Sequence, residues 1–189
     1  MKYKGRELPD IDLTPYIEVA VKEFGKDLMM EPLTLEYLER IQLHINLVNY
    51  FGNKVGNSYP SHDSSKITML LPAYRIYRKP KEERTKEEND ALDVATIIHI
   101  TQSSHHPEYW TDTDLTGFTR SNYTPNGIIH AEQMDVDSII HMCADWCACS
   151  CEFGTNTPME WFNRVNGIRW YFTPEQQDLI ISTINKMWD

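Results

Sequence analysis

The chain has 189 residues, of which 41% are hydrophobic, 24% charged and 11% aromatic, and its formal net charge at pH 7 is −10. This length and apolar content suit one domain with its own core. The negative charge argues against broad binding to nucleic acid or to anionic membranes, because both need a basic surface. The aromatic content excludes a disordered acidic tail. We therefore expect a single folded domain over residues 1–189.

No stretch of the sequence suggests export or a membrane span. The segment from Met1 to Asp12 is polar, with no apolar run behind its basic residues, and no later run is long enough to cross a bilayer. We expect a cytoplasmic protein without a membrane partner. The cysteines suit neither a disulfide framework nor a zinc knuckle, so buried reduced thiols are expected and a four-thiol zinc cluster is the weaker alternative. They are Cys143, Cys147, Cys149 and Cys151.

Hydrophobic periodicity predicts a chain made mostly of helices. After an irregular segment, 1–15, the charged stretch 79–90 is expected to be a solvated loop that leads into a helix. The longest irregular segment, 107–128, contains several aromatic residues and is a candidate lid. We expect an all-α bundle of five to seven helices. The predicted helices cover 34–51, 67–77, 86–102, 136–151, 158–165 and 174–187.

A set of histidines and aspartates lies on or beside the apolar faces of these helices. Burying several such groups is costly unless they are paired or bind a cation. The set therefore predicts one or two divalent metal ions, and imidazole with carboxylate favours Fe, Mn, Ni or Zn over Ca or Mg alone. The candidate ligands are His44, His62, Asp63, His99, His105, His106 and Asp145.

Other polar residues near this set have simpler interpretations. Lys66 follows His62 by four residues and can reach the same pocket, although a solvated helix lysine is the alternative. His141 lies one helical turn before Asp145, but we expect an ordinary boundary residue there, and a surface residue at His130. Taken singly, each candidate histidine has a structural explanation as a core or capping residue.

The order of these residues resembles a known signature. His44, the pair His62-Asp63 and Asp145 are similar to the HD-domain superfamily of metal-dependent phosphohydrolases, and 62–66 resembles its H-D-x-x-K motif. The chain also resembles an uncharacterised family of small HD-like bacterial and phage proteins, through 105–110 and 142–146. The resemblance covers most of the chain and implies an HD-type helical bundle, with ligands from at least three helices. The uncharacterised family has no activity defined by assay.

The additional histidines His99, His105 and His106 resemble those of HD proteins that hold two metals with a bridging aspartate, here Asp63. The glycine-rich signature of the HD-type cyclic-dinucleotide phosphodiesterases is absent, and the spacing from His99 to His105 is shorter than in that subclass. The resemblance implies hydrolysis of a nucleotide or other small phosphorylated compound by a metal-activated water. Asp63 would orient the water and Lys66 would offset phosphoryl charge, while the non-ligating member of the His105-His106 pair would protonate the leaving oxygen.

Two other functions remain open. Some HD-fold proteins use a similar ligand set as a di-iron oxygenase, and a degenerate site would leave a non-catalytic protein that binds a nucleotide or a partner. The sequence has no glycine-rich phosphate loop, nucleophilic serine elbow or dinucleotide fingerprint. Substrate, metal and oligomeric state are not specified by the sequence.

Overall fold

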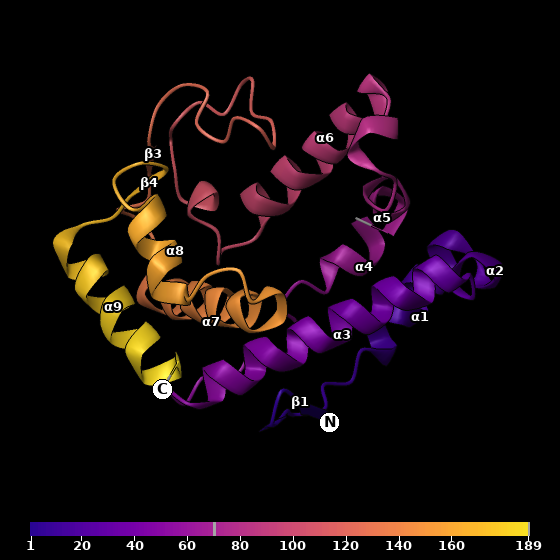
Figure 1. Cartoon of the computed structure of the whole chain (residues 1–189), viewed down its shortest axis with the longest axis horizontal. Coiled ribbons are helices and arrows are strands. Elements are labelled where there is room, and N and C mark those ends of the chain that lie inside the picture. The colour runs from indigo at the N-terminus through magenta and orange to yellow at the C-terminus, as the bar shows by residue number, and fades with distance from the viewer. Residues whose placement is uncertain (70, 189) are drawn as a thin grey trace.

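The computed structural model describes residues 1–69 and 71–188, and side chains are described outside 68–72. It is predominantly helical, which confirms the all-α prediction (Figure 1). The helices of the described residues are α1 (Thr14–Phe24), α2 (Lys26–Met29), α3 (Pro32–Asn53), α4 (Ser65–Met69), α5 (Leu71–Tyr77), α6 (Lys86–Gln102), α7 (Val136–Phe153), α8 (Pro158–Val165) and α9 (Pro174–Trp188), with short 3-10 turns η1 (Lys81–Glu83) and η2 (Pro107–Tyr109).

Two short strand pairs accompany the helices. β1 (Lys2–Tyr3) and β2 (Arg6–Glu7) form an antiparallel hairpin at the N-terminus. β3 (Ile129–His130) and β4 (Trp170–Tyr171) pair in parallel, with Ile129 opposite Trp170. The second pair fixes the end of the long loop 107–128 to the segment between α8 and α9.

The described residues contain more helices than the expected five to seven. The difference lies partly before residue 30, where α1 and α2 were not predicted and where the hairpin β1–β2 occupies part of the segment expected to be irregular. Helix α1 begins at Thr14-Pro15, and proline in a first helical turn needs no N–H donor. The predicted run 67–77 comprises α4 and α5, and their junction at residue 70 lies outside the described residues.

Helix α3 extends from the neighbourhood of α1 and α2 to that of α9 (Figure 1). It contributes to two apolar cores. The C-terminal core contains Val48 and Phe51 of α3 together with residues of α7, α8 and α9. The N-terminal core contains Ile41 and Ile45 of α3 together with residues of α1, α4 and α5. His44 therefore lies where α3 passes from one core to the other.

The loop 107–128 is tied to the rest of the fold near its start and in its second half. Buried Glu108 accepts hydrogen bonds from Arg169 (2.7 Å) and from Trp170 Nε1 (2.9 Å). Arg120 donates from its backbone N and its Nε to Asp93 Oδ1 on α6, at 3.0 and 2.7 Å. The Arg120 contacts place the loop beside α6, and Figure 1 shows the loop as an arch next to that helix.

The cysteines lie on α7 as free thiols, and Cys143, Cys147 and Cys151 are buried, as predicted. Among the cysteines within residues 1–69 and 71–188, only Cys149 belongs to a group of side chains close enough to share a metal ion. Over the same range, no helix is long and apolar enough to cross a membrane.

Candidate metal centre

The turn that carries His62 and Asp63 is fixed by the buried side chain of Asn49 on α3. Asn49 Nδ2 donates to the carbonyls of Ile45 (2.8 Å) and Tyr59 (3.0 Å). Its Oδ1 accepts from the backbone N of Tyr59 at 2.7 Å. The backbone N of His62 then donates to the Tyr59 carbonyl at 3.0 Å. One buried amide thus attaches the turn to α3.

Asp63 has an unusual backbone conformation within this turn. Its φ is 53°, in the left-handed region that few residues other than glycine occupy, although aspartate and asparagine tolerate it. Such conformations cost about 1–3 kcal/mol and concentrate at functional sites. The side chain points inward and only 6% of the residue is exposed. Lys66 Nζ forms an ion pair with its Oδ2.

The Asp63 carboxylate lies between two groups of histidines. Its Oδ2 is 3.2 Å from His62 Nε2 and 3.7 Å from His44 Nε2. Its Oδ1 is 3.3 Å from His99 Nε2 and 3.6 Å from His105 Nε2. Each carboxylate oxygen therefore faces a different pair of imidazoles, which is the arrangement a bridging ligand needs.

The first group combines α3, the turn and α7. His44 Nε2 lies 3.2 Å from His62 Nε2 and 3.0 Å from Asp145 Oδ1. His62 Nε2 lies 3.5 Å from the same Asp145 oxygen. Ligand atoms of His44, His62 and Asp63 are all within 4.8 Å of one another. Three separate elements thus bring four of the predicted residues together.

The second group lies at the end of α6 and in the turn that follows. His106 Nε2 is 3.1 Å from His99 Nε2, and the rings of His105 and His106 have centroids 4.3 Å apart. Ligand atoms of all three residues are within 4.8 Å of one another. All seven predicted residues therefore surround one centre.

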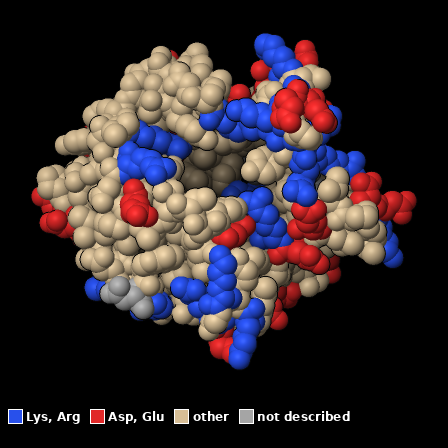
Figure 2. Space-filling model, viewed as in Figure 1, with Lys and Arg blue, Asp and Glu red and all other residues tan. Residues whose placement is uncertain are grey.

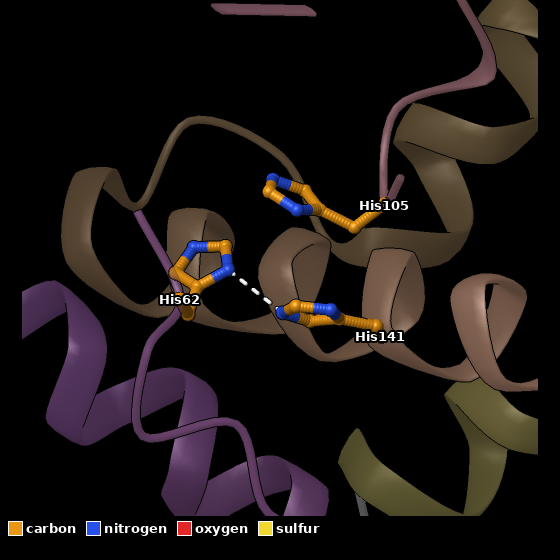
Figure 3. Close-up of side chains that lie close together, drawn as sticks. All are labelled: His62, His105 and His141. Carbon is orange, nitrogen blue, oxygen red and sulfur yellow. Dashed lines mark hydrogen bonds between the residues drawn. The ribbon is translucent and has the colours of Figure 1, made fainter. Parts of the chain in front are cut away.

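His141 joins the centre, although the sequence favoured a boundary role for it. Its Nε2 lies 2.8 Å from His62 Nδ1, and Figure 3 shows the rings of His62, His105 and His141 grouped together. These three also have ligand atoms within 4.8 Å of one another. Its ring stacks on Tyr59, with centroids 3.8 Å apart. The position of His141 four residues before Asp145, on the same helix face, was the signal available in the sequence.

Glu152 is a second residue of the centre that the sequence pattern did not indicate. Its Oε2 lies 3.1 Å from His44 Nδ1, and its Oε1 accepts from Arg40 Nε at 3.0 Å. Glu152 follows Asp145 by seven residues, two helical turns, so it shares that face of α7. Cys149 lies closer along the helix, and its Sγ is 3.7 Å from Asp145 Oδ1.

Buried ligand atoms without a hydrogen-bond partner indicate that these residues fit a metal ion. Among the described side chains, Asp63 Oδ1 and His105 Nε2 are buried and have no hydrogen-bond partner. Buried polar atoms of this kind are rare and costly. The Nε2 atoms of His44 and His62 also face each other at 3.2 Å, an arrangement that needs a proton or a cation between two lone pairs. Imidazole nitrogen with carboxylate oxygen suits a transition metal, so the centre can hold such an ion.

Ionisation favours cation binding at the second histidine group and at Asp63. Burial lowers the pKa of His99 to about 3 and lowers the pKa of His105 well below its ordinary value, so both are neutral at pH 7. Burial alone would raise the pKa of Asp63, but His62 and Lys66 outweigh it and hold that pKa well below its usual range. Neutral imidazoles and ionised carboxylates are the forms that bind metal. At His44 a cation must displace a proton, because burial lowers the pKa of that ring but Asp145 and Glu152 outweigh burial and raise it to about 9.

A cavity of about 400 Å³ opens onto the centre. Figure 2 shows a hollow with Lys and Arg side chains at its edge. Stacked rings of Tyr37 and Tyr74, with centroids 4.4 Å apart, form part of its wall. Cationic Arg40, Lys66 and Arg120 also line it. The cavity thus combines an apolar wall with positive charge next to the centre.

Comparison with known proteins gives a family but no activity. No curated protein and no solved structure matches the chain. A family model described as a family of unknown function (DUF5662) matches residues 33–186. This range includes every residue of the centre described above. The chain therefore belongs to this family of unknown function, DUF5662.

Proposed function

We propose that the protein is a metal-dependent phosphohydrolase of the HD type, acting on a nucleotide or another small phosphorylated compound. The observation that carries the proposal is the position of Asp63. Its two carboxylate oxygens face different histidine pairs, and its buried Oδ1 has no hydrogen-bond partner among the described residues. One or two divalent transition metal ions held there supply Lewis-acid activation of a water nucleophile when bound.

Lys66 is the residue that we propose binds the phosphoryl group. Burial lowers the pKa of its ammonium, but Asp63 and Asp145 outweigh burial and raise that pKa, so the side chain is charged. It also lines the cavity. A fixed positive charge there offsets the negative charge that develops on phosphoryl oxygens during hydrolysis.

The two histidines of the predicted acid pair differ in access to the cavity. His106 lines the cavity, whereas His105 is 5% exposed and packs against His62 and His141. We therefore assign the hydrogen bond to the leaving oxygen to His106 and a ligand role to His105. Burial lowers the pKa of His106, so it donates through the N–H of a neutral ring.

The test combines metal content with a phosphate-release panel of nucleotides and sugar phosphates. Asp63→Asn is the variant of choice, because asparagine tolerates the left-handed backbone that alanine does not. We expect near-stoichiometric transition metal in the wild type, and a folded variant, by circular dichroism, that loses both metal and phosphate release. Asp178→Asn, at an exposed site on α9, is the matched control. A wild type that binds no metal after reconstitution would overturn the proposal.

A di-iron oxygenase is the second candidate, because a carboxylate with one oxygen toward each histidine group suits two irons equally well. Iron as the metal bound to the purified protein, together with oxygen uptake and no phosphate release, would favour the oxygenase. Manganese, nickel or zinc with phosphate release would favour hydrolysis.

A further inference from the structure

One face of α7 carries three polar residues in a row. His141, Asp145 and Glu152 are separated by four and seven residues, spacings that return to the same side of an α-helix. Asp145 contacts the Nε2 atoms of both His44 and His62. The two flanking residues contact the other ring nitrogens of the same histidines. Residues of α7 therefore contact both ring nitrogens of His44 and both ring nitrogens of His62.

His44 is held at both nitrogens. Its Nε2 faces the centre, 3.0 Å from Asp145, while its Nδ1 lies 3.1 Å from Glu152 Oε2. A carboxylate can only accept, so Glu152 keeps a ring proton on Nδ1. This leaves Nε2, beside Asp145, as the nitrogen that can bind a cation in place of a proton. Glu152 is itself fixed, because its other oxygen accepts from Arg40 Nε at 3.0 Å, and the Arg40 guanidinium lies 5.2 Å from the centre of the Phe153 ring.

His62 is held in the same way by a neutral partner. Its Nε2 faces Asp63 at 3.2 Å, and its Nδ1 lies 2.8 Å from His141 Nε2, as the dashed line in Figure 3 shows. A neutral imidazole has one donor and one acceptor nitrogen, so His141 Nε2 accepts from His62 Nδ1 when the His141 proton lies on its own Nδ1. The His141 ring lies flat on Tyr59, at an interplanar angle of 2°, which restricts its rotation.

We infer that Glu152 and His141 are positioning residues of the metal centre. They keep the protons of His44 and His62 on Nδ1 and thereby direct both Nε2 lone pairs toward the cation. The inference rests on the proposed function, because it needs a cation at the centre. Partners of this kind orient metal-binding histidines in other proteins, and their loss typically weakens metal binding by about 10–100-fold.

Isothermal titration of the metal-free, full-length chain with Mn²⁺ and with Zn²⁺ tests the inference. We expect dissociation constants about 10–100-fold higher in Glu152→Ala and in His141→Ala, with the number of bound ions unchanged. Glu152→Gln should fall between wild type and Glu152→Ala, because one carbonyl oxygen must then serve both Arg40 and His44. Glu23→Ala and His130→Ala, at exposed positions on α1 and β3, are matched controls with wild-type affinity.

Nitrogen-15 NMR of the Zn²⁺-bound protein separates positioning from a general loss of structure. We expect His44 and His62 of the wild type to carry their protons on Nδ1, and each variant to change the Nδ1–H signal only of the histidine it contacts. Affinities within about twofold of wild type in both variants would overturn this inference and leave the proposed metal centre standing. Fewer bound ions in His141→Ala would make His141 a ligand and overturn its positioning role. A wild type that binds neither metal would overturn the metal centre and the inference together.

Discussion

Buried neutral histidines make the metal-free protein sensitive to acid. Burial lowers the pKa of His99 to about 3, from 6.5, and lowers that of His105 well below its ordinary value. Below pH 6.5 the unfolded chain therefore binds protons that the folded chain excludes. Stability should fall as the pH decreases from 6.5, by about 1.4 kcal/mol per pH unit for each such histidine.

Urea unfolding of the chelator-treated protein at pH 7.0, 6.0 and 5.0 measures this effect. His99→Gln should show a shallower decrease than the wild type, because one of the excluded protons no longer contributes. Equal free energies of unfolding at the three pH values would contradict the neutral state of these histidines.

The sequence contained most of the information about which residues gather at the centre. Histidine and aspartate at helix faces are expensive to bury, and this physical argument selects His44, His99 and Asp145 from the sequence alone. It could not select Glu152, because an acidic residue near a helix end is ordinary and its contact with His44 depends on how α3 packs against α7. Nor could it assign His141 to the centre. A position one helical turn from Asp145 does not reveal the residue that His141 contacts outside its own helix, which is His62.

Single buried side chains fix the positions of whole segments, and Asn49 is the first example. Asn49→Ala removes the donor and the acceptor that fix Tyr59 and leaves buried backbone groups unpaired, at a cost of about 2–3 kcal/mol. Because the same turn carries Asp63, we expect weaker Mn²⁺ binding as well as a lower free energy of unfolding. Urea unfolding and titration calorimetry measure the two effects. Asn53→Ala, exposed on α3, should change neither, and an unaffected Asn49→Ala variant would contradict this role.

Glu108 plays a similar part for the long loop. Its side chain is fully buried, and it pairs with Arg169 and Trp170. Removal of one member of a buried pair leaves the other uncompensated, so Glu108→Ala should reduce the free energy of unfolding by about 3 kcal/mol. Faster proteolytic cleavage within residues 107–128 should accompany the loss. The exposed pair of Glu132 with His130 supplies the control, Glu132→Ala, for which we expect little change in either measurement.

Helices with strong local signals were predictable and those without were not. Thr85 and Glu88 form a reciprocal capping box at the start of α6, and Thr157 and Glu160 do the same for α8, so both helices have the predicted bounds. Helix α2 has only four residues, too few for a periodic pattern to stand out. Its boundary with α1 depends on Gly25, whose φ of 84° ends one helix and admits the next.

At the scale of the whole molecule, α3 joins the two cores into one unit. It contributes Ile41 and Ile45 to the N-terminal core and Val48 and Phe51 to the C-terminal core, so we expect the two cores to unfold together. All five tryptophans of the chain lie in the C-terminal core or pack against it. Tryptophan fluorescence therefore reports on that core, whereas far-UV circular dichroism reports on every helix.

We expect urea unfolding curves from these two signals to coincide, with one midpoint and one slope. A fluorescence transition displaced from the circular dichroism transition would show that the cores unfold separately. Tyr74→Trp places a fluorescent reporter within the N-terminal core. If the two cores unfold together, the fluorescence of this variant should show the same unfolding transition as its circular dichroism.

The left-handed backbone at Asp63 also bears on how the family can diverge. The turn requires a residue that accepts positive φ, whereas the proposed chemistry requires a carboxylate, and aspartate meets both demands. A lineage that abandoned the chemistry but kept the turn would be expected to carry asparagine or glycine at this position. Replacement by other residues would be selected against on folding grounds alone. The residue found here in other members would therefore separate loss of catalysis from loss of architecture.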